Sequence, residues 1–243
     1  MEDDSGRRQY RLKVRDLRTG QDLPDVLTGL SSSLAWAKDS KTLYLVKNDP
    51  VTLLSTQVLQ HTLGQNPADA SLVYEETDNS FYMGVGNSND DNYVIIYSSS
   101  TVSSEMQVMD ASKPGSKFTS LAPRERDVKY SADHVNGRWI IQTDWQAPNY
   151  RIMTVAADKI GDRNNWQPLV AHSDSVFIQG FTAFKDYLAI NERSEGLRRI
   201  KIMPWNALDK ATYVASDEAA YMTGSELTID GGILAGSAAA PGS

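Results

Sequence analysis

The sequence predicts an all-β protein, namely a partial β-propeller of four-stranded antiparallel blades with a short mixed C-terminal tail. The first observation is a pattern that recurs four times, with starts 46 to 50 residues apart, at residues 35–48, 85–99, 131–144 and 180–193. Each copy has an apolar or small lead-in, a polar turn and a β-prone apolar run. A strand-based repeat of about 40–50 residues is typical of propeller blades.

The second observation is a further strand after each repeat. Alternation of apolar and polar residues with a period of two predicts a third strand in all four blades, at residues 55–63, 103–111, 149–157 and 197–203. A fourth, outer strand is predicted in the first three blades only, at residues 71–76, 116–122 and 165–171. These signals are weak one by one, but they reinforce one another because they recur at one spacing.

The third observation is that the pattern is incomplete at both ends. Residues 10–28 look like the last two strands of an earlier blade, and the outer strand expected after Met203 is missing. We therefore expect a disordered or tag-like N-terminus at residues 1–9 and about three full blades flanked by half blades at residues 10–203. Residues 204–243 are expected to form a separate segment with a flexible tail.

An open propeller of this kind leaves unpaired backbone N–H and C=O groups on its edge strands, and such edges pair readily with other chains. We expect self-association through the edges at residues 10–17 and 197–203. Residues 225–229 are β-prone and are expected to fold back as a substitute outer strand at the C-terminal edge.

Composition excludes several classes of function. The net charge of −7 argues against nucleic-acid binding, which needs clustered Lys and Arg. The absence of cysteine excludes disulfides, thiolate nucleophiles and zinc–thiolate sites. No apolar run approaches the ~20 residues that cross a bilayer, and the charged residues 1–8 do not look like a signal peptide. We expect a cytoplasmic protein with neither a membrane nor a nucleic acid as partner.

Several longer stretches carry a family resemblance. They include VRDLRTGQDLPD at residues 14–25, LVYEETDNSFYMGVG at residues 72–86 and VFIQGFTAFKDYLAINERSEGLRRIKI at residues 176–202. Together with residues 35–58, they make residues 10–203 resemble the central part of the propeller of oligopeptidase B enzymes. These enzymes are serine peptidases of the prolyl oligopeptidase family that cleave short peptides after basic residues. The resemblance implies a seven-bladed propeller that caps an α/β-hydrolase domain, with peptides or that domain as partners.

The C-terminal segment carries a different motif. Residues 211–236 contain YVASDEAAYMTGSELTIDGG. This stretch resembles the last helix, loop and strand of short-chain dehydrogenases. In that family the segment contributes packing and subunit contacts beside the cofactor domain, so the resemblance implies no cofactor binding by this part alone.

The motifs that catalysis needs in either family are absent from the chain. A hydrolase of this type needs a nucleophilic serine in Gly-x-Ser-x-Gly, and residues 29–33 and 86–90 both lack the second glycine. A dehydrogenase needs a glycine-rich turn and a Tyr-x-x-x-Lys pair, and Tyr44 and Lys47 have the wrong spacing. We therefore expect no catalytic, cofactor-binding or metal-binding residues, and no cofactor.

Single polar and aromatic residues are expected in structural roles. The histidines lack the spacing of metal ligands and are expected at the surface or at strand ends: His61, His134 and His172. Two acidic pairs are expected to be solvated loop charges, with attraction of a basic peptide as the alternative: Glu75 with Glu76, and Asp90 with Asp91. A basic cluster is expected on a solvated strand face: Arg193, Arg198, Arg199 and Lys201. The tryptophans are expected to pack within blades: Trp36, Trp139, Trp145, Trp166 and Trp205.

Three functional interpretations remain open. The first is a non-catalytic propeller segment that restricts access to a peptidase active site. The second is a dehydrogenase-like or hydrolase-like subunit whose catalytic residues come from another chain. The third is a fusion product with no selected activity, joined near residues 204–210. The missing catalytic motifs favour the first interpretation.

Overall fold

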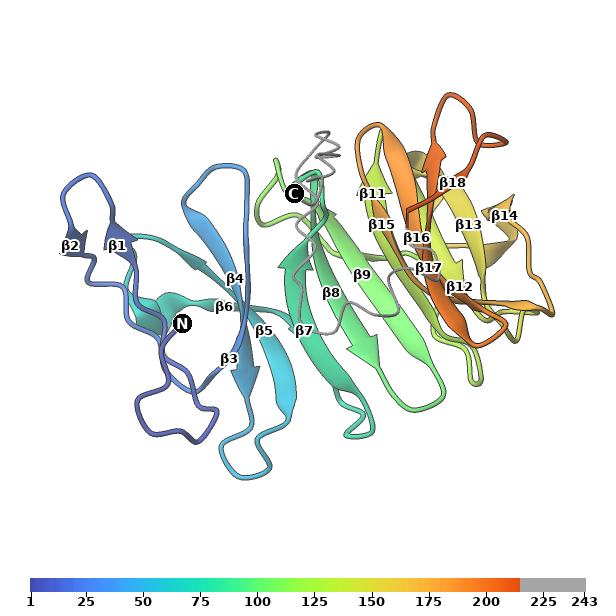
Figure 1. Cartoon of the computed structure of the whole chain (residues 1–243). Helices are drawn as coiled ribbons and strands as arrows, with labels where there is room; N and C mark the ends of the chain where they lie inside the picture. The colour runs from blue at the N-terminus through green and yellow to red at the C-terminus, as the bar shows by residue number, and fades with distance from the viewer. Residues whose placement is uncertain (215–243) are drawn as a thin grey trace, which may run out of the picture.

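The computed structural model describes residues 1–214, which contain four consecutive four-stranded antiparallel sheets (Figure 1). In each sheet the strands are hydrogen-bonded in chain order, as in a meander. The first sheet consists of β3 (Leu30–Trp36), β4 (Thr42–Asn48), β5 (Ser55–Thr62) and β6 (Ser71–Glu75). The second sheet consists of β7 (Tyr82–Asn87), β8 (Tyr93–Ser99), β9 (Ser104–Asp110) and β10 (Thr119–Ser120).

The remaining sheets repeat this order. The third sheet consists of β11 (Tyr130–Val135), β12 (Arg138–Thr143), β13 (Arg151–Ala156) and β14 (Gln167–Val170). The fourth consists of β15 (Val176–Ala183), β16 (Tyr187–Ser194), β17 (Leu197–Pro204) and β18 (Thr212–Tyr213). The helices of the described part are single 3-10 turns: η1 (Pro67–Asp69), η2 (Ala157–Lys159) and η3 (Arg163–Asn165). The predicted all-β fold with four-stranded antiparallel blades is confirmed.

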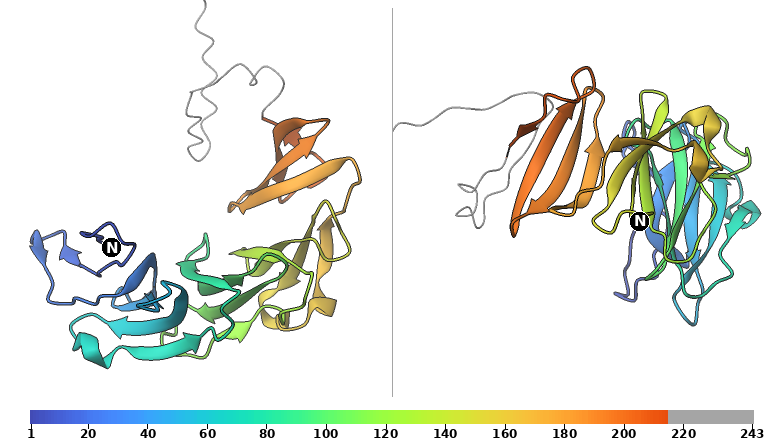
Figure 2. Two further views of the ribbon diagram at one scale, coloured as in Figure 1. Left: turned by 90° about the horizontal axis from the view of Figure 1, so that it is seen from below. Right: turned by 90° about the vertical axis from the view of Figure 1, so that its right-hand side faces the viewer.

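The sheets stand side by side in an open arc (Figure 2). The first strand of each sheet lies toward the concave side of the arc, where β3 contacts β7 and β11 contacts β15. The fourth strands lie toward the convex side, where successive sheets are farther apart. This is the arrangement of blades in part of a propeller.

The core consists of layers between successive sheets, and this explains the continuous apolar runs of the second strands. In β8, Val94 and Ile96 pack toward the first sheet, whereas Ile95 packs toward the third. In β12, Trp139 and Ile141 pack toward the second sheet. Because a strand covered on both faces has no solvated side, alternation disappears there and apolar residues follow one another, as in Val94, Ile95 and Ile96. The layers therefore hold neighbouring sheets together by hydrophobic burial.

Short turns join the first and second strands of each sheet. Asn136 and Gly137 form the two-residue turn between β11 and β12, with φ angles of 51° and 77°. A turn with positive φ at both positions matches the twist of a hairpin, and Asn-Gly is the sequence that adopts it at least cost. In the first sheet Asp39 accepts hydrogen bonds from the backbone N–H groups of Lys41 and Thr42 instead. These turns fall within the four repeated stretches of the sequence.

The fourth sheet differs from the prediction. We expected the fourth blade to lack an outer strand, but β18 pairs antiparallel with Lys201 and Ile202 of β17. The described residues therefore contain four complete four-stranded sheets in place of about three full blades flanked by halves. The substitute outer strand predicted at residues 225–229 lies outside the described residues.

The N-terminal residues also have partners. Glu2 pairs with Arg11 and Tyr10 pairs with Leu30, both antiparallel. A small two-stranded sheet follows, with β1 (Arg15–Asp16) and β2 (Gln21–Asp22). Leucines from this region cover the face of the first sheet that points away from the second sheet, since Leu12 and Leu27 pack on Leu30, Leu43 and Leu45. Residues 1–9, which were expected to be disordered or tag-like, thus contain a residue, Glu2, that is paired with Arg11.

Candidate functional site: the junctions between sheets and the cavity beside β15

The residues tested for catalysis in the sequence have structural positions. Tyr44 is fully buried, and its hydroxyl oxygen accepts a hydrogen bond of 3.1 Å from the backbone N–H of Gly115. Burial raises the pKa of Tyr44. Lys47, its sequence neighbour in the failed Tyr-x-x-x-Lys motif, is exposed on the same strand. Tyr44 therefore links the first sheet to the loop after β9. Its hydroxyl is buried, so it is not placed to act as an acid on a substrate.

His61 is buried together with an aspartate. Its Nε2 lies 2.8 Å from Oδ1 of Asp25, and both side chains are 1% exposed. The same carboxylate oxygen accepts a hydrogen bond of 2.7 Å from the backbone N–H of Gly64. The pair fixes the segment after β2 onto the end of β5. His61 does lie at a strand end, but its burial with a charged partner was not predicted.

His134 joins the second and third sheets. Its Nδ1 lies 2.7 Å from Oδ2 of Asp90, in the turn between β7 and β8. Its ring contacts two aromatic rings, with centroids 4.6 Å from Tyr93 and 5.2 Å from Trp139. Burial acts to raise the pKa of Asp90, but hydrogen bonds from His134, Ser88 and Asn92 outweigh it and lower the pKa. Asp90 was expected to be a solvated loop charge, and that expectation is wrong.

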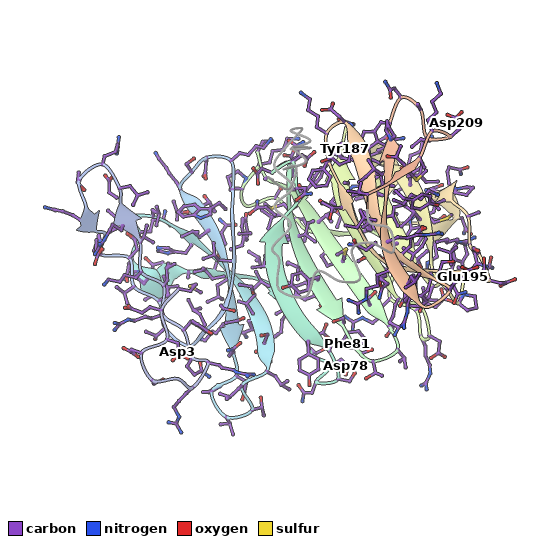
Figure 3. All side chains as sticks on the ribbon, viewed as in Figure 1. Asp3, Asp78, Phe81, Tyr187, Glu195 and Asp209 are labelled. Atoms are coloured by element: carbon purple, nitrogen blue, oxygen red, sulfur yellow. The ribbon has the colours of Figure 1, made fainter. Side chains whose placement is uncertain are left out.

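Glu76 joins the first and second sheets and was likewise expected to be solvated. Its side chain is 6% exposed, and Oε2 lies 2.6 Å from Nη2 of Arg124. Nε of Arg124 lies 3.3 Å from Oε2 of Glu105 on β9. The guanidinium carbon also lies 3.5 Å from the ring centroid of Phe81, just before β7. Figure 3 shows Phe81 and Asp78 together at this end of the sheets.

The remaining predicted residues are divided between core and surface. Trp139 and Trp166 are buried in the layer between the second and third sheets, as expected for blade packing. In the basic cluster, Arg193 and Arg198 are exposed as expected. Arg199 is not simply solvated, because its Nε lies 2.6 Å from Oε1 of the buried Glu192.

The described residues offer no site for a metal. Among residues 1–214, no three His, Asp or Glu side chains gather closely enough to hold an ion. The helices in this part of the chain are all too short to span a membrane. We therefore expect ligand sites in the openings between the described sheets.

One opening lies where β8 and β12 end and β9, β11 and β15 begin. It is an open hollow of about 340 Å³, and its lining includes Ser99, Lys129, Ser131, Tyr150, Phe177 and Gln179. Lys129 is the one charged residue of this lining. Tyr150 and Phe177 form an edge-to-face pair, with centroids 5.6 Å apart and an interplanar angle of 86°. We call this opening the β15 cavity.

The walls of the β15 cavity are held in place by buried hydrogen bonds. The hydroxyl of Tyr130 donates to the carbonyl oxygen of Ala122 and accepts from the backbone N–H of Met106. Nε2 of Gln142 donates to the carbonyl oxygen of Ile178 over 2.9 Å. Burial, and the carboxylate of Asp144, raise the pKa of Tyr150, so its phenol stays protonated. The strands around the β15 cavity are therefore hydrogen-bonded to one another, with Lys129 in the lining and the Asp144 carboxylate beside it.

Two exposed tyrosines lie on the second sheet, where Tyr82 is paired with Ser99 of the cavity lining. Tyr82 on β7 is 72% exposed and Tyr97 on β8 is 43% exposed. Tyr97 is paired with Gly84 and lies across it, because a Cβ at Gly84 would be 2.2 Å from the Tyr97 hydroxyl oxygen. Sequence reasoning did not find this group or the β15 cavity, because both depend on strands that are far apart in the chain.

Comparison with known proteins places the chain in a family. A model described as the N-terminal β-propeller domain of prolyl oligopeptidase matches residues 1–228. Dipeptidyl aminopeptidase BI of Pseudoxanthomonas mexicana is 45% identical over 224 residues, which are 92% of this chain and 30% of the relative. Protease 2 of Moraxella lacunata is 24% identical over 205 residues, which are 84% of this chain and 29% of the relative. The chain thus spans about 30% of the length of these relatives.

Solved structures agree with this match. Oligopeptidase B from Leishmania major has a TM-score of 0.77 at 26% identity, over 83% of this chain and 28% of that chain. Oligopeptidase B from Trypanosoma brucei has a TM-score of 0.74 at 22% identity, over 84% of this chain and 29% of that chain, and shares the fold.

The comparisons also bear on the ends of the chain. The family match includes residues 1–9 and most of the segment at residues 211–236. The comparisons do not support the dehydrogenase resemblance of that segment, and they support neither a dehydrogenase-like subunit nor a fusion product. From its fold and this match, the chain belongs to the family of prolyl oligopeptidase N-terminal β-propeller domains.

Proposed function

We propose that this chain acts as the non-catalytic propeller part of a serine peptidase, where it restricts which peptides reach a hydrolase domain. The observation that carries the proposal is the 45% identity to a protein named a dipeptidyl aminopeptidase, confined to 30% of that relative's length. The Gly-x-Ser-x-Gly nucleophile motif is absent from the chain itself. Peptides and a hydrolase domain are therefore its proposed partners.

The geometry supports a role in access control. The sheets form an arc with their first strands toward its concave side (Figure 2), and Tyr82 on the first strand β7 is 72% exposed. Neighbouring sheets are joined by buried ion pairs as well as by apolar layers, for example Glu76 with Arg124. A wall that is rigid on this scale can exclude a long polypeptide, folded or unfolded, while admitting a short peptide. The proposal thus assigns substrate selection to shape and leaves bond cleavage to the hydrolase domain.

Two measurements test this function. Alone, the purified chain should not cleave dipeptide or Arg- and Lys-ended chromogenic substrates, and no serine should react with a fluorophosphonate probe. It should likewise show no oxidation or reduction of alcohols and ketones with NAD(H) or NADP(H). Stoichiometric labelling of one serine would overturn the non-catalytic assignment.

The second measurement tests access control directly. This chain replaces the corresponding part of the Pseudoxanthomonas relative, and the hydrolysis of a chromogenic dipeptide and of unfolded casein is compared. The chimera should cleave the dipeptide and exclude casein, whereas the relative without this part should lose that discrimination. Equal discrimination with and without this part would contradict the proposal.

We also infer a cytoplasmic location for the peptidase. It is supported by composition, namely an acidic chain without cysteine. Fractionation of the source cells with a compartment marker would test it.

A further inference from the structure

The β15 cavity has a charge that differs from that of the chain as a whole. The chain has a net charge of −7, yet the one charged residue that lines this cavity is Lys129. Among residues 1–214, Lys129 forms no ion pair, although Asp144 is close and accepts a hydrogen bond of 2.6 Å from its backbone N–H. Lys129 can therefore pair with the carboxylate of a ligand, and Asp144 is the competing acidic group beside it.

One wall of the cavity is aromatic and is held in a strained conformation. Tyr150 has φ of 65°, which is an outlier for a bulky residue other than glycine. The surrounding chain maintains it: the backbone N–H of Tyr150 donates to Ala147, and Ile178 N–H donates to the carbonyl oxygen of Asn149. Strain of this kind persists only where several contacts hold the residue. The result is a fixed aromatic wall, in which Phe177 is 39% exposed.

Polar, neutral side chains also line the cavity. Ser131 on β11 and Gln179 on β15 are exposed and belong to first strands, which line the concave side of the arc. Their hydroxyl and amide groups can both donate and accept hydrogen bonds. A volume of about 340 Å³ is near the lower limit for ligand sites, so the occupant is a small group or the end of a chain.

We propose that the β15 cavity binds the C-terminal residue of a peptide that has an apolar or aromatic side chain. The carboxylate is placed at Lys129, the side chain against Tyr150 and Phe177, and the last peptide group beside Ser131 and Gln179. This inference rests on the proposed function, because it assumes that peptides occupy the concave side. It adds a subsite on the propeller that selects the substrate by its carboxyl end.

The experiment is a calorimetric titration of the full 243-residue chain with acetyl-Ala-Phe carrying a free carboxylate. The matched ligands are the same dipeptide as its amide, acetyl-Ala-Arg with a free carboxylate, and 3-phenylpropionate. The free dipeptide should bind more tightly than the amide and than the arginine peptide. Lys129→Gln should weaken binding of the free dipeptide about fivefold and leave the amide unchanged. Phe177→Ala should weaken binding of the free dipeptide and of its amide, each about fivefold.

Controls separate this site from general charge effects and from misfolding. Lys117→Gln removes an exposed lysine away from the cavity and should change nothing. Lys129→Arg should retain binding, and the thermal melting of each variant shows whether it is folded. Equal binding of amide and acid, no effect of Lys129→Gln, or no binding at all would overturn the proposal. If phenylpropionate binds as tightly as the dipeptide, the cavity is a general carboxylate site and the proposed peptide subsite is wrong. None of these results bears on whether the chimera distinguishes the dipeptide from casein. The proposed function is therefore tested independently of this subsite.

Discussion

Buried charged residues connect segments of this chain that are far apart in sequence. Asp25 and His61 are 36 residues apart and both are almost fully excluded from solvent. A lone buried aspartate would be costly, because a charge that leaves water needs compensation from partners. Here the compensation is His61 and the backbone N–H of Gly64. The pair therefore fixes where the N-terminal region attaches to the first sheet.

Replacing Asp25 by alanine should destabilise the fold strongly. The substitution leaves His61 and the Gly64 N–H buried without their partner, and loss of one member of a buried pair costs about 3 kcal/mol. Urea denaturation should show this loss in the free energy of unfolding. Asp209→Ala is the matched control, since Asp209 is exposed on the loop before β18 (Figure 3), and it should change stability little. Equal effects of the two substitutions would contradict the structural role of Asp25.

Gly84 and Gly86 on β7 provide a matched pair of glycines. A methyl group at Gly84 would lie 2.2 Å from the Tyr97 hydroxyl oxygen and 2.3 Å from its ring, whereas nothing lies within 4 Å of the corresponding position at Gly86. Gly84→Ala should therefore lower the free energy of unfolding by about 1–2 kcal/mol, as Tyr97 is forced aside. Gly86→Ala should be neutral or slightly stabilising, because it lowers the entropy of the unfolded chain. The double variant Gly84→Ala with Tyr97→Ala should recover much of the loss, and its failure to do so would show that the clash is with the backbone.

At the scale of elements, the turns between first and second strands fasten neighbouring sheets. Asp133 on β11 accepts a hydrogen bond of 2.8 Å from the backbone N–H of Asn89 in the turn after β7. The side-chain amide of Asn136 donates to the carbonyl oxygen of Lys185 in the turn of the fourth sheet. These links repeat from sheet to sheet, so they resist sliding of one blade against the next.

The stability of the contact between the second and third sheets depends on pH through Asp133. Burial raises its pKa above the ordinary value of 3.8, so the ionised form is disfavoured in the folded state. The resulting loss of stability is present at neutral pH and disappears as the pH falls below the ordinary value. Asp133→Asn keeps an acceptor for Asn89 and should raise the free energy of unfolding at pH 7 by an amount on the order of 1 kcal/mol. Thermal melts at pH 7 and at low pH test this, and a gain that persists at low pH would contradict it.

The sequence predicted central strands well and outer strands poorly, for a physical reason. β4, β8, β12 and β16 coincide with the repeated apolar runs, because burial on both faces leaves a strong local signal. Outer strands are short and exposed, so their boundaries depend on pairing: β10 covers Thr119–Ser120 within a predicted strand at residues 116–122. β18 was missed entirely, since only β17 makes it a strand. The buried ion pairs and the β15 cavity left no local signal, because they join distant segments.

At the scale of the whole molecule, apolar layers between the sheets stabilise the arc. The fourth sheet, at the end of the arc, has one face that no other described sheet covers. Ile200 and Ile202 are partly exposed on the side of the fourth sheet that points away from the third, opposite Asn191 and Ala189. The first sheet has no equivalent surface, because Leu12 and Leu27 cover it. Contacts with further protein are therefore expected at this face of the fourth sheet. Self-association through the strand edges at residues 10–17 and 197–203 stays a prediction.

The last prediction concerns the edge of this sheet. β18 pairs with Lys201 and Ile202, and Tyr213 lies under the guanidinium of Arg199, with 4.6 Å from its carbon to the ring centroid. Deleting residues 211–243 removes β18 and leaves the edge of β17 unpaired, so the truncated chain should self-associate more strongly than the full chain. Deleting residues 215–243 keeps every described strand, and this control should behave like the full chain. Sedimentation over a range of concentrations distinguishes the two variants. Identical sedimentation of both deletions would mean that β18 does not protect the edge, and any association would then have to arise from the exposed face with Ile200 and Ile202.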